Sequence, residues 1–296
     1  MPLLPISEIE QLAPVFRGKR GNALAKRILH MLEFDKVEDI YAKVEDTKGP
    51  DGARSILEIA GVHYSVAGEE YLEDLPEGPF IIISNHPIGS LDGIILIDYI
   101  AHMFPDFKVM VNKVLERVRN LEQNFIRVTP VGEQRTAPTA QSISGVRLAW
   151  EHIKEGHPLG LFPAGAVSDL IPGKRPVVTM PDGSTYKEPK VRDRDWQLPI
   201  VKFISKVGVP VVPMRFFDGN SRIFYNLGAL HGWKVRLTRF PHEVVNKAGK
   251  TIRLGIGPVI TPEQMEGCRD LEELRILLRG SVFSQVPDNL VFKQKL

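Results

Sequence analysis

The chain has 296 residues, of which 43% are apolar and 25% charged, and its formal net charge is +2. These values are typical of a globular protein with a substantial core. The small net charge and the lack of a basic block interleaved with aromatic residues argue against a nucleic-acid-binding protein. The single cysteine, Cys268, excludes an internal disulfide and a cysteine-based metal cluster.

Residues 1–60 are predicted to form an N-terminal helical segment. Asn22–Phe34 places Leu24, Ile28 and Met31 on one helical face and basic residues on another, and Lys36–Val44 favours a further helix. Such a segment can cap the domain or lie in a lipid headgroup layer. The chain has neither a signal-peptide core in its first thirty residues nor an apolar run of membrane-spanning length, so we expect a cytoplasmic protein that at most lies on the membrane.

Residues 61–296 alternate between strand and helix patterns and are predicted to form one domain. Expected strands are 62–66, 80–83, 107–111, 159–162, 209–217, 234–239 and 251–256, and expected helices are 93–103, 138–154, 196–207 and 270–279. Residues 166–195 look like a long, charged excursion rich in proline and glycine. The alternation predicts an α/β fold with a mixed, largely parallel sheet covered by helices on both faces.

The loop after the strand at 80–83 carries the first candidate site. His86 follows the strand directly, and Asp92 precedes the next helix. A turn between them can place the carboxylate on one ring nitrogen, so that the other nitrogen acts as a general base. The alternatives are that Asp92 is an ordinary N-cap and that His86 is a buried histidine bonded to the backbone. No GxSxG elbow is present, so we expect a substrate hydroxyl to be the nucleophile.

The loop after the strand at 159–162 carries the second candidate site, Phe162-Pro163-Ala164-Gly165-Ala166-Val167-Ser168-Asp169. Ligands bind beyond the carboxyl ends of strands in open α/β sheets, and both candidate loops leave the ends of strands. Backbone N–H groups around Gly165 can cradle an anionic head group or a developing oxyanion. The alternative is a tight turn after the strand, and both can hold at once.

Four ordered blocks give the chain a family resemblance over roughly residues 60–260. Asn85, His86 and Asp92 resemble the NHxxxxD motif of the glycerolipid (lysophosphatidic acid, PlsC-type) acyltransferase superfamily. The other blocks are Phe125-Ile126-Arg127, the FPEGTRS-like 162–168 and the proline-bearing 209–213. The HPxGxxDG form and Gly219-Asn220-Ser221 resemble a bacterial hemolysin-like branch associated with O-acylation of lyso-ornithine or lyso-glycine lipids.

The resemblance implies catalytic roles for His86 and Asp92. It also implies substrate-binding roles, listed here in chain order, for Asn85, Arg127, Pro163, Gly165 and Ser168. We find no HExxH-type spacing, so we expect no metal site.

The sequence departs from the family pattern in two places. Five residues, instead of four, separate His86 from Asp92, and Gly89 can absorb the extra one because glycine tolerates positive φ. Ala164 and Val167 stand where the family has glutamate and arginine. Either the acceptor is not a phosphomonoester, or Arg127, Lys174 or Arg175 supplies the missing charge, unless the last two are simply solvated.

The sequence thus predicts an O-acyltransferase, similar to 1-acylglycerol-3-phosphate acyltransferases, acting in membrane lipid biosynthesis. The acyl donor would be a thioester of acyl carrier protein or coenzyme A, the acceptor a lysophospholipid or lyso-amino-acid lipid, and no cofactor is expected. The protein would lie on the inner face of the membrane. The alternatives are a catalytically silent lipid-binding protein with the same fold and a hydrolase that transfers the acyl group to water.

Overall fold

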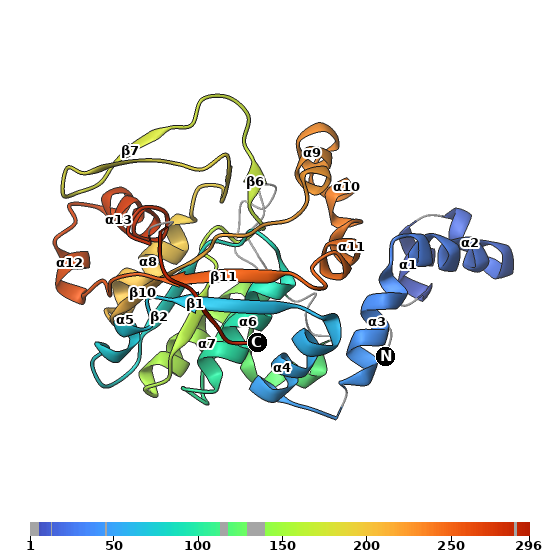
Figure 1. Cartoon of the computed structure of the whole chain (residues 1–296), viewed down its shortest axis with the longest axis horizontal. Helices are drawn as coiled ribbons and strands as arrows, with labels where there is room; N and C mark the ends of the chain where they lie inside the picture. The colour runs from blue at the N-terminus through green and yellow to red at the C-terminus, as the bar shows by residue number, and fades with distance from the viewer. Residues whose placement is uncertain (1–5, 13, 45, 113–117, 129–139, 287–288) are drawn as a thin grey trace.

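A computed structural model describes residues 6–12, 14–44, 46–112, 118–128, 140–286 and 289–296. Its centre is an eight-stranded sheet (Figure 1). The strands, in spatial order, are β12 (Lys293–Gln294), β1 (His63–Ala67), β11 (Thr251–Ile256), β10 (Val211–Phe216), β2 (Ile81–Ser84), β5 (Leu159–Leu161), β3 (Lys108–Asn112) and β4 (Phe125–Val128).

Five neighbouring strands, β10, β2, β5, β3 and β4, run parallel. β11 is antiparallel to β10 and parallel to β1, while β12 is antiparallel to β1. The sheet is therefore mixed and largely parallel, as the sequence predicts. The carboxyl ends of β2 and β5, which are hydrogen-bonded neighbours, lie side by side at one edge, so the two loops with candidate residues start next to each other.

Helices cover both faces of the sheet, and this prediction is also confirmed. The described helices are α1 (Ile6–Leu12), α2 (Gly18–Met31), α3 (Phe34–Lys43), α4 (Gly49–Ala60), α5 (Glu70–Glu73), α6 (Ser90–Ala101), α7 (Ala140–Lys154), α8 (Leu198–Val207), α9 (Arg222–His231), α10 (Trp233–Leu237), α11 (Phe240–Val245), α12 (Pro262–Glu266) and α13 (Leu271–Phe283), with 3₁₀ turns at Pro14–Phe16 and Arg119–Asn124. The predicted helix start at Pro138 lies outside the described residues.

Two apolar layers result from the alternation of side chains along the strands. Ile82 packs with α4 and α6 on one face, whereas Ile81 and Ile83 pack with α7, α8 and α13 on the other. The apolar run of β2 is thus buried on both sides, which fixes the backbone from which His86 emerges.

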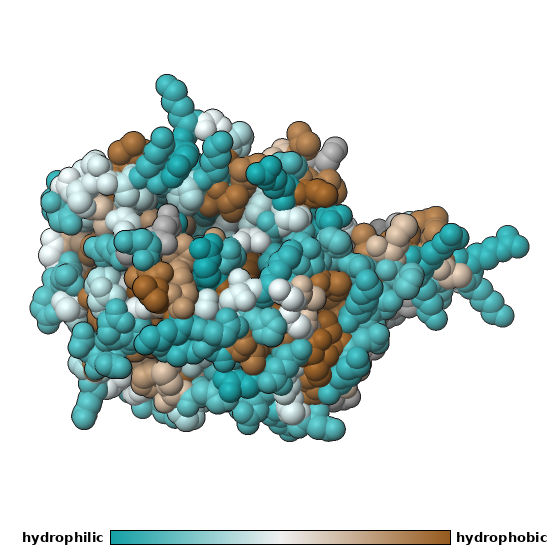
Figure 2. Space-filling view, in the orientation of Figure 1, coloured by the Kyte–Doolittle hydropathy of each residue, from teal (hydrophilic) through white to brown (hydrophobic). Residues whose placement is uncertain are grey.

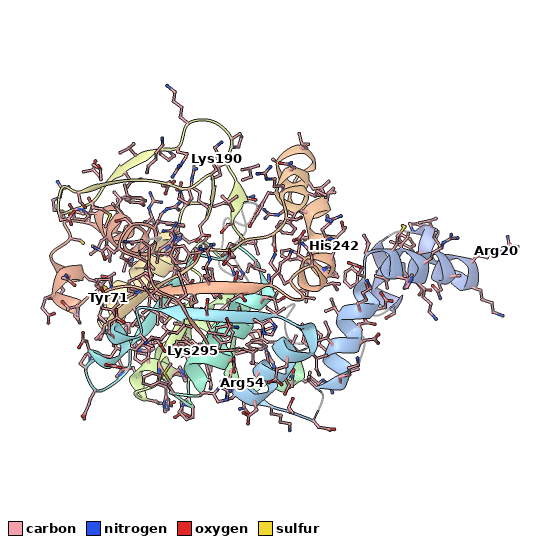
Figure 3. All side chains as sticks on the ribbon, in the orientation of Figure 1. Arg20, Arg54, Tyr71, Lys190, His242 and Lys295 are labelled. Atoms are coloured by element: carbon pink, nitrogen blue, oxygen red, sulfur yellow. The ribbon has the colours of Figure 1, made fainter. Side chains whose placement is uncertain are left out.

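The N-terminal helices α1 to α3 project from one side of the body (Figure 1). Arg20 lies at the outer end of this arm, and His242 of α11 faces the arm from the body (Figure 3). The imidazole Nδ1 of His242 lies 2.6 Å from a carboxylate oxygen of Glu33, between α2 and α3. Among the described residues, no helix has the length and apolar character needed to cross a bilayer.

Residues 234–239 are not the strand that the sequence predicts. They lie largely in the short helix α10, which packs against α9. The alternation of apolar and basic residues suggested a strand with its apolar face buried. Instead Arg236 is the buried residue, at 4% exposure, while Val235 and Leu237 are each 42% exposed. A buried ion pair at Arg236, described below, orients this segment.

The excursion at 166–195 forms two small antiparallel ribbons at the top of Figure 1. They are β6 (Asp169–Leu170) with β9 (Val191–Arg192), and β7 (Val177–Thr179) with β8 (Thr185–Lys187). Arg279 of α13 is buried and ties the excursion down through Glu188 and through the carbonyl oxygens of Asp193 and Arg194.

Candidate active site

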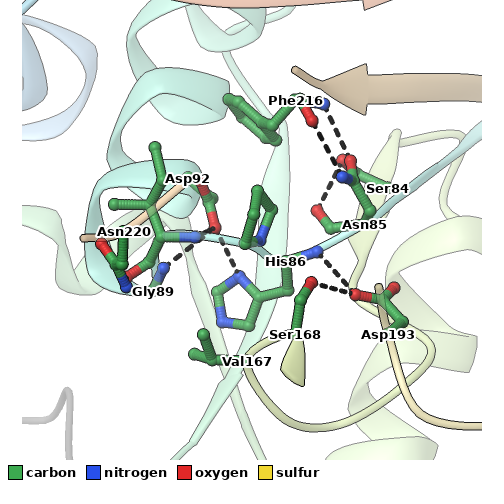
Figure 4. A network of polar contacts seen from close by, with 12 residues as sticks. Ser84, Asn85, His86, Gly89, Asp92, Val167, Ser168, Asp193, Phe216 and Asn220 are labelled. Carbon is green, nitrogen blue, oxygen red and sulfur yellow. Dashed lines mark hydrogen bonds and ion pairs between the residues drawn. The ribbon is translucent and has the colours of Figure 1, made fainter. Parts of the chain in front are cut away.

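His86 and Asp92 meet at the carboxyl end of β2 (Figure 4). His86 follows the strand by two residues, and Asp92 lies in the first turn of α6. The imidazole Nδ1 and the carboxylate Oδ2 are 2.9 Å apart, with side-chain exposures of 19% and 0%. Nδ1 makes no well-aligned hydrogen bond among the described residues, so this is a close contact between the two groups rather than an aligned hydrogen bond. The pair is shielded while the imidazole still reaches solvent.

The carboxylate of Asp92 organises the whole loop. Its Oδ2 also accepts hydrogen bonds from the backbone N–H groups of Ile88, at 2.9 Å, and Gly89, at 3.0 Å. Two backbone donors and the N-terminal end of α6 stabilise its negative charge. Asp92 is therefore not the N-cap, which is Gly89. Because the helix begins at Ser90, three residues earlier than predicted, Asp92 occupies its third position. There its carboxylate caps the helix by accepting from the N–H of Gly89, and it also faces His86.

Gly89 absorbs the additional residue between His86 and Asp92. Its backbone has φ 111° and ψ −126°, a conformation essentially restricted to glycine. A Cβ placed there would lie 2.7 Å from a ring carbon of Phe240. Glycine is thus required both by the backbone and by the space, and the interpretation of Gly89 as the kink is confirmed.

The Gly219–Ser221 stretch and α9 hold the same loop from outside. The Tyr225 hydroxyl donates to the carbonyl oxygen of Pro87 at 2.8 Å, and the Asn220 amide donates to that of Ile88 at 2.9 Å. Burial raises the pKa of the Tyr225 phenol, so this group stays protonated and remains a donor. Residues far along the chain therefore fix the path from His86 to Asp92.

Asp193 joins the two candidate loops. Its Oδ1 accepts hydrogen bonds from the backbone N–H of His86 at 3.2 Å and the hydroxyl of Ser168 at 2.6 Å (Figure 4). Its Oδ2 accepts one from Trp196 Nε1 at 3.1 Å. The backbone N–H of Ser168 donates to the carbonyl oxygen of His86 at 2.8 Å. Burial raises the pKa of the Asp193 carboxyl. A buried carboxylate thus anchors the backbone of His86.

The loop after β5 forms one wall of the site. Phe162 stacks on the His86 ring, with centroids 4.1 Å apart and planes at 27°. Gly165 has φ 66°, and its N–H donates to the carbonyl oxygen of Phe162 at 2.9 Å. The tight-turn interpretation therefore holds for Gly165, whose own N–H is already used within the turn. Pro163 is buried, and its carbonyl oxygen accepts from the N–H of Gln197 at 3.1 Å.

Arg236 reaches the back of this second loop. Its guanidinium donates to the carbonyl oxygens of Ser168, at 3.1 Å, and Val167, at 3.3 Å, and pairs with the carboxylate of Asp169. Arg194 pairs with the other oxygen of Asp169 at 2.5 Å. Both cations are therefore engaged with protein groups, and Arg236 stabilises the loop that lacks the family's own arginine.

The structure places the remaining predicted substrate-binding residues as follows. Asn85 is buried, with its amide nitrogen and oxygen bonded to the backbone of Phe216 at 2.9 and 2.8 Å. Ser168 is buried in its contact with Asp193. Arg127 lies at the carboxyl end of β4, three strands from β2, and pairs with Glu122. Their contacts with a substrate stay predictions.

The basic residues considered as substitutes for the missing charge have different surroundings. The guanidinium of Arg175 donates to the carbonyl oxygens of Glu188 and Lys187, so it stabilises the excursion. Lys174 is exposed, as the solvated alternative expects.

Sequence reasoning missed Asp193, Tyr225 and Arg236. Asp193 lies in the run Arg192-Asp193-Arg194-Asp195, which is typical of a solvated loop. Tyr225 and Arg236 had no motif of their own, although the nearby Gly219-Asn220-Ser221 stretch stood out. Only the fold brings these three side chains to the site.

Other possible binding features lie elsewhere. One surface hollow, of about 260 Å³, is lined by residues such as Lys43 and Val245. Another, of about 200 Å³, is lined by residues such as Trp150 and Val207. Neither includes His86 or Asp92. Within the described part of the chain, no cluster of three His, Cys, Asp or Glu residues has metal-binding geometry.

The chain is similar to known acyltransferases. The model of a family described as acyltransferase matches residues 25–283. A lyso-glycine lipid O-acyltransferase of Phocaeicola vulgatus is 23% identical over 86% of this chain and 85% of its own length. One of Bacteroides thetaiotaomicron is 27% identical over 68% of this chain and 64% of its own. The solved 1-acyl-sn-glycerophosphate acyltransferase PlsC of Thermotoga maritima is 18% identical, with TM-score 0.47, over 95% of this chain and 92% of that one.

Proposed function

Because this chain belongs to the acyltransferase family and is an O-acyltransferase, we propose that it transfers a fatty acyl group from an acyl thioester to the hydroxyl of a lyso-lipid, with His86 as general base. The observation that carries the proposal is the 2.9 Å contact between His86 Nδ1 and Asp92 Oδ2 in a loop that starts from a buried strand. With Nδ1 facing the carboxylate, Nε2 is the nitrogen left for the substrate.

The reaction needs no nucleophile from the protein. The lyso-lipid oxygen attacks the thioester carbonyl carbon while its proton moves to His86 Nε2. The C–S bond then breaks, and the imidazolium returns the proton to the leaving thiolate. Asp92 stabilises the imidazolium, and a base of this kind contributes about 10²–10⁴-fold in rate.

The acceptor we propose carries no phosphomonoester and is a lyso-amino-acid lipid or a lysophospholipid. Positions 164 and 167 hold alanine and valine, and the nearby Arg194 and Arg236 are engaged with Asp169. A phosphomonoester bears more charge than a carboxylate and would require such cations to be available. The names of the two bacterial relatives, lyso-glycine lipid O-acyltransferases, support the same class of acceptor.

We propose further that the donor is a thioester of acyl carrier protein or coenzyme A, that no cofactor takes part, and that the protein acts on the inner face of the membrane. The chemistry of acyl transfer from a thioester supports the second point, since it needs only a base and a positioned carbonyl.

The test offers a labelled acyl thioester to the purified protein with a panel of lyso-lipids and identifies the product by mass. His86→Ala should lower the rate of transfer by about 10²–10⁴-fold. His157→Ala is the matched control, because His157 also faces an aspartate, Asp106, at 3.4 Å, but at the surface. Transfer at the wild-type rate by the His86 variant would disprove the mechanism.

Two alternative functions give different outcomes in the same assay. A catalytically silent lipid-binding protein would bind lyso-lipid with no turnover, and a hydrolase would release free fatty acid whether or not acceptor is present. The altered spacing of the first motif was one argument for a silent protein, and the meeting of His86 and Asp92 removes it. The block at 162–168, which has no charged side chain, is what still favours that alternative.

A further inference from the structure

The α9–α10 hairpin has two different faces. Its inner face is buried and holds the active-site loops through Tyr225 and Arg236, and Phe224 beneath the Arg236 guanidinium completes this face. On its outer face Ile223 and Leu230, seven positions apart in α9, are 57% and 77% exposed. In α10, Val235 and Leu237, on either side of the buried Arg236, are each 42% exposed. Figure 2 shows apolar atoms gathered over these helices, at the upper right of the body.

The charge of the hairpin has one sign. Residues 219–242 contain no aspartate or glutamate, and their cations are Arg222, Lys234, Arg236 and Arg239. Arg236 is used inside, whereas Arg222 is exposed beside Ile223 and Arg239 is half-buried. An apolar surface with an exposed arginine beside it, on a stretch of chain without acidic residues, is complementary to a lipid surface with anionic headgroups.

The position of the hairpin relates this surface to the reaction. Tyr225 and Arg236 on its inner face bind Pro87 and the loop at 167–169, so the outer face lies directly behind the walls of the site. We propose that the outer face of α9–α10 docks on an anionic lipid bilayer and so places the active site at the surface that holds the acceptor. This inference rests on the proposed function and names the surface that brings the enzyme to its lipid.

A membrane fits this face better than a second copy of the chain. A symmetric dimer through the hairpin would bring the cations of two copies together without an acidic residue between them, which is unfavourable. The basic N-terminal arm carries exposed Leu24 and Met31 and could contact the same membrane, but it is attached to α11 rather than to the active-site loops.

The test measures co-flotation of the full chain with vesicles of phosphatidylcholine and phosphatidylglycerol in equal parts. The double variant Ile223→Ser, Leu230→Ser should bind roughly tenfold more weakly or worse, because two apolar anchors are lost. The control, Leu148→Ser with Val177→Ser, removes two apolar side chains that are 52% and 65% exposed elsewhere, and should bind like the wild type. Arg222→Glu should weaken binding to these vesicles and leave any binding to pure phosphatidylcholine unchanged.

Wild-type vesicle binding by the double variant, with the circular dichroism melting curve unchanged, would overturn the proposal. So would a wild-type dimer, seen by analytical ultracentrifugation, that dissociates in the double variant, since the hairpin would then be a subunit interface. His86→Ala separates this inference from the proposed function. If His86→Ala abolishes acyl transfer while the hairpin variants bind vesicles like the wild type, only the docking surface is wrong. If binding depends on the hairpin but the wild type transfers no acyl group, only the function is wrong.

Discussion

The loops after β2 and β5 leave neighbouring parallel strands at the same edge of the sheet, yet they are built in different ways. The loop at 84–92 closes around a buried carboxylate, Asp92, which accepts two backbone N–H groups and faces His86. The loop at 162–169 contributes an aromatic ring and a glycine turn, and its one carboxylate, Asp169, is neutralised from behind by Arg194 and Arg236.

The two loops therefore have different roles, proton transfer in the first and positioning in the second. The first loop contains the groups that can move a proton, and the second has no charged side chain between Phe162 and Ser168. The second loop therefore positions Phe162 against the imidazole and brings no charge of its own to the site between Phe162 and Ser168. Substitutions in the two loops should consequently affect different kinetic constants.

The largest effect should come from the carboxylate of the first loop. Asp92→Asn removes the negative charge that stabilises the imidazolium and can select the wrong tautomer of His86, so kcat should fall by about 10²–10⁴-fold. KM for the lyso-lipid should change little, since the amide keeps the shape. Asp169→Asn in the second loop is the comparison, and it should lower kcat far less. Equal losses in the two variants would mean that the division between the loops is wrong.

Gly89→Ala tests whether the kink holds the pair together. A non-glycine residue at this backbone conformation costs about 1–3 kcal/mol of folding free energy. The new Cβ would also meet Phe240, so kcat should fall as well because Asp92 moves relative to His86. Urea denaturation and steady-state kinetics measure the two effects.

Gly78→Ala is the matched control for this substitution. Gly78 has φ 117°, but nothing lies within 4 Å of its added Cβ. It should lose stability through backbone strain alone and keep the wild-type kcat. A Gly89 variant that loses only stability, with kcat unchanged, would show that the kink is not needed for catalysis.

Asp193→Asn tests the connection between the two loops. The amide oxygen can still accept from the His86 N–H, but the amide nitrogen would face the Trp196 N–H, donor against donor. An unsatisfied buried donor costs about 1–3 kcal/mol, so the variant should be less stable, and kcat should fall several-fold with little change in KM. Asp182→Asn, on the exposed part of the same excursion, should have neither effect. An unchanged kcat for Asp193→Asn would limit this residue to a role in folding.

The sheet and the central pair of the site could be predicted from sequence because their signals are local. A four-residue apolar run such as Phe80–Ile83 is typical of a buried strand, and a histidine and an aspartate on the loop that follows can only lie at its carboxyl end. The glycine between them gave the position of the kink.

The anchors of the site could not be predicted because their contacts join distant parts of the chain. Asp193 is 107 residues from His86, and Tyr225 is 138 residues from Pro87. The prediction of a strand at 234–239 was wrong for a related reason. It assumed that apolar side chains face inward, whereas here Arg236 is buried against the distant Asp169 and its apolar neighbours are exposed.

The smallest effect should appear outside both loops, at His152 of α7, and concerns stability rather than rate. Burial, together with the charge of Lys108, lowers the pKa of His152 below its ordinary value of 6.5. As the pH falls below about 6.5, the unfolded chain therefore takes up a proton that the folded protein refuses, and the free energy of unfolding decreases until the folded-state pKa is reached. His152→Gln keeps a donor for the carbonyl oxygen of Pro158 but cannot titrate. The urea midpoint of the variant should depend less on pH between about 7 and 5 than that of the wild type, with kcat unaffected. If the urea midpoint depends on pH equally in the variant and the wild type, a group other than His152 causes the dependence. If the substitution changes kcat, residues outside the two loops also affect the reaction.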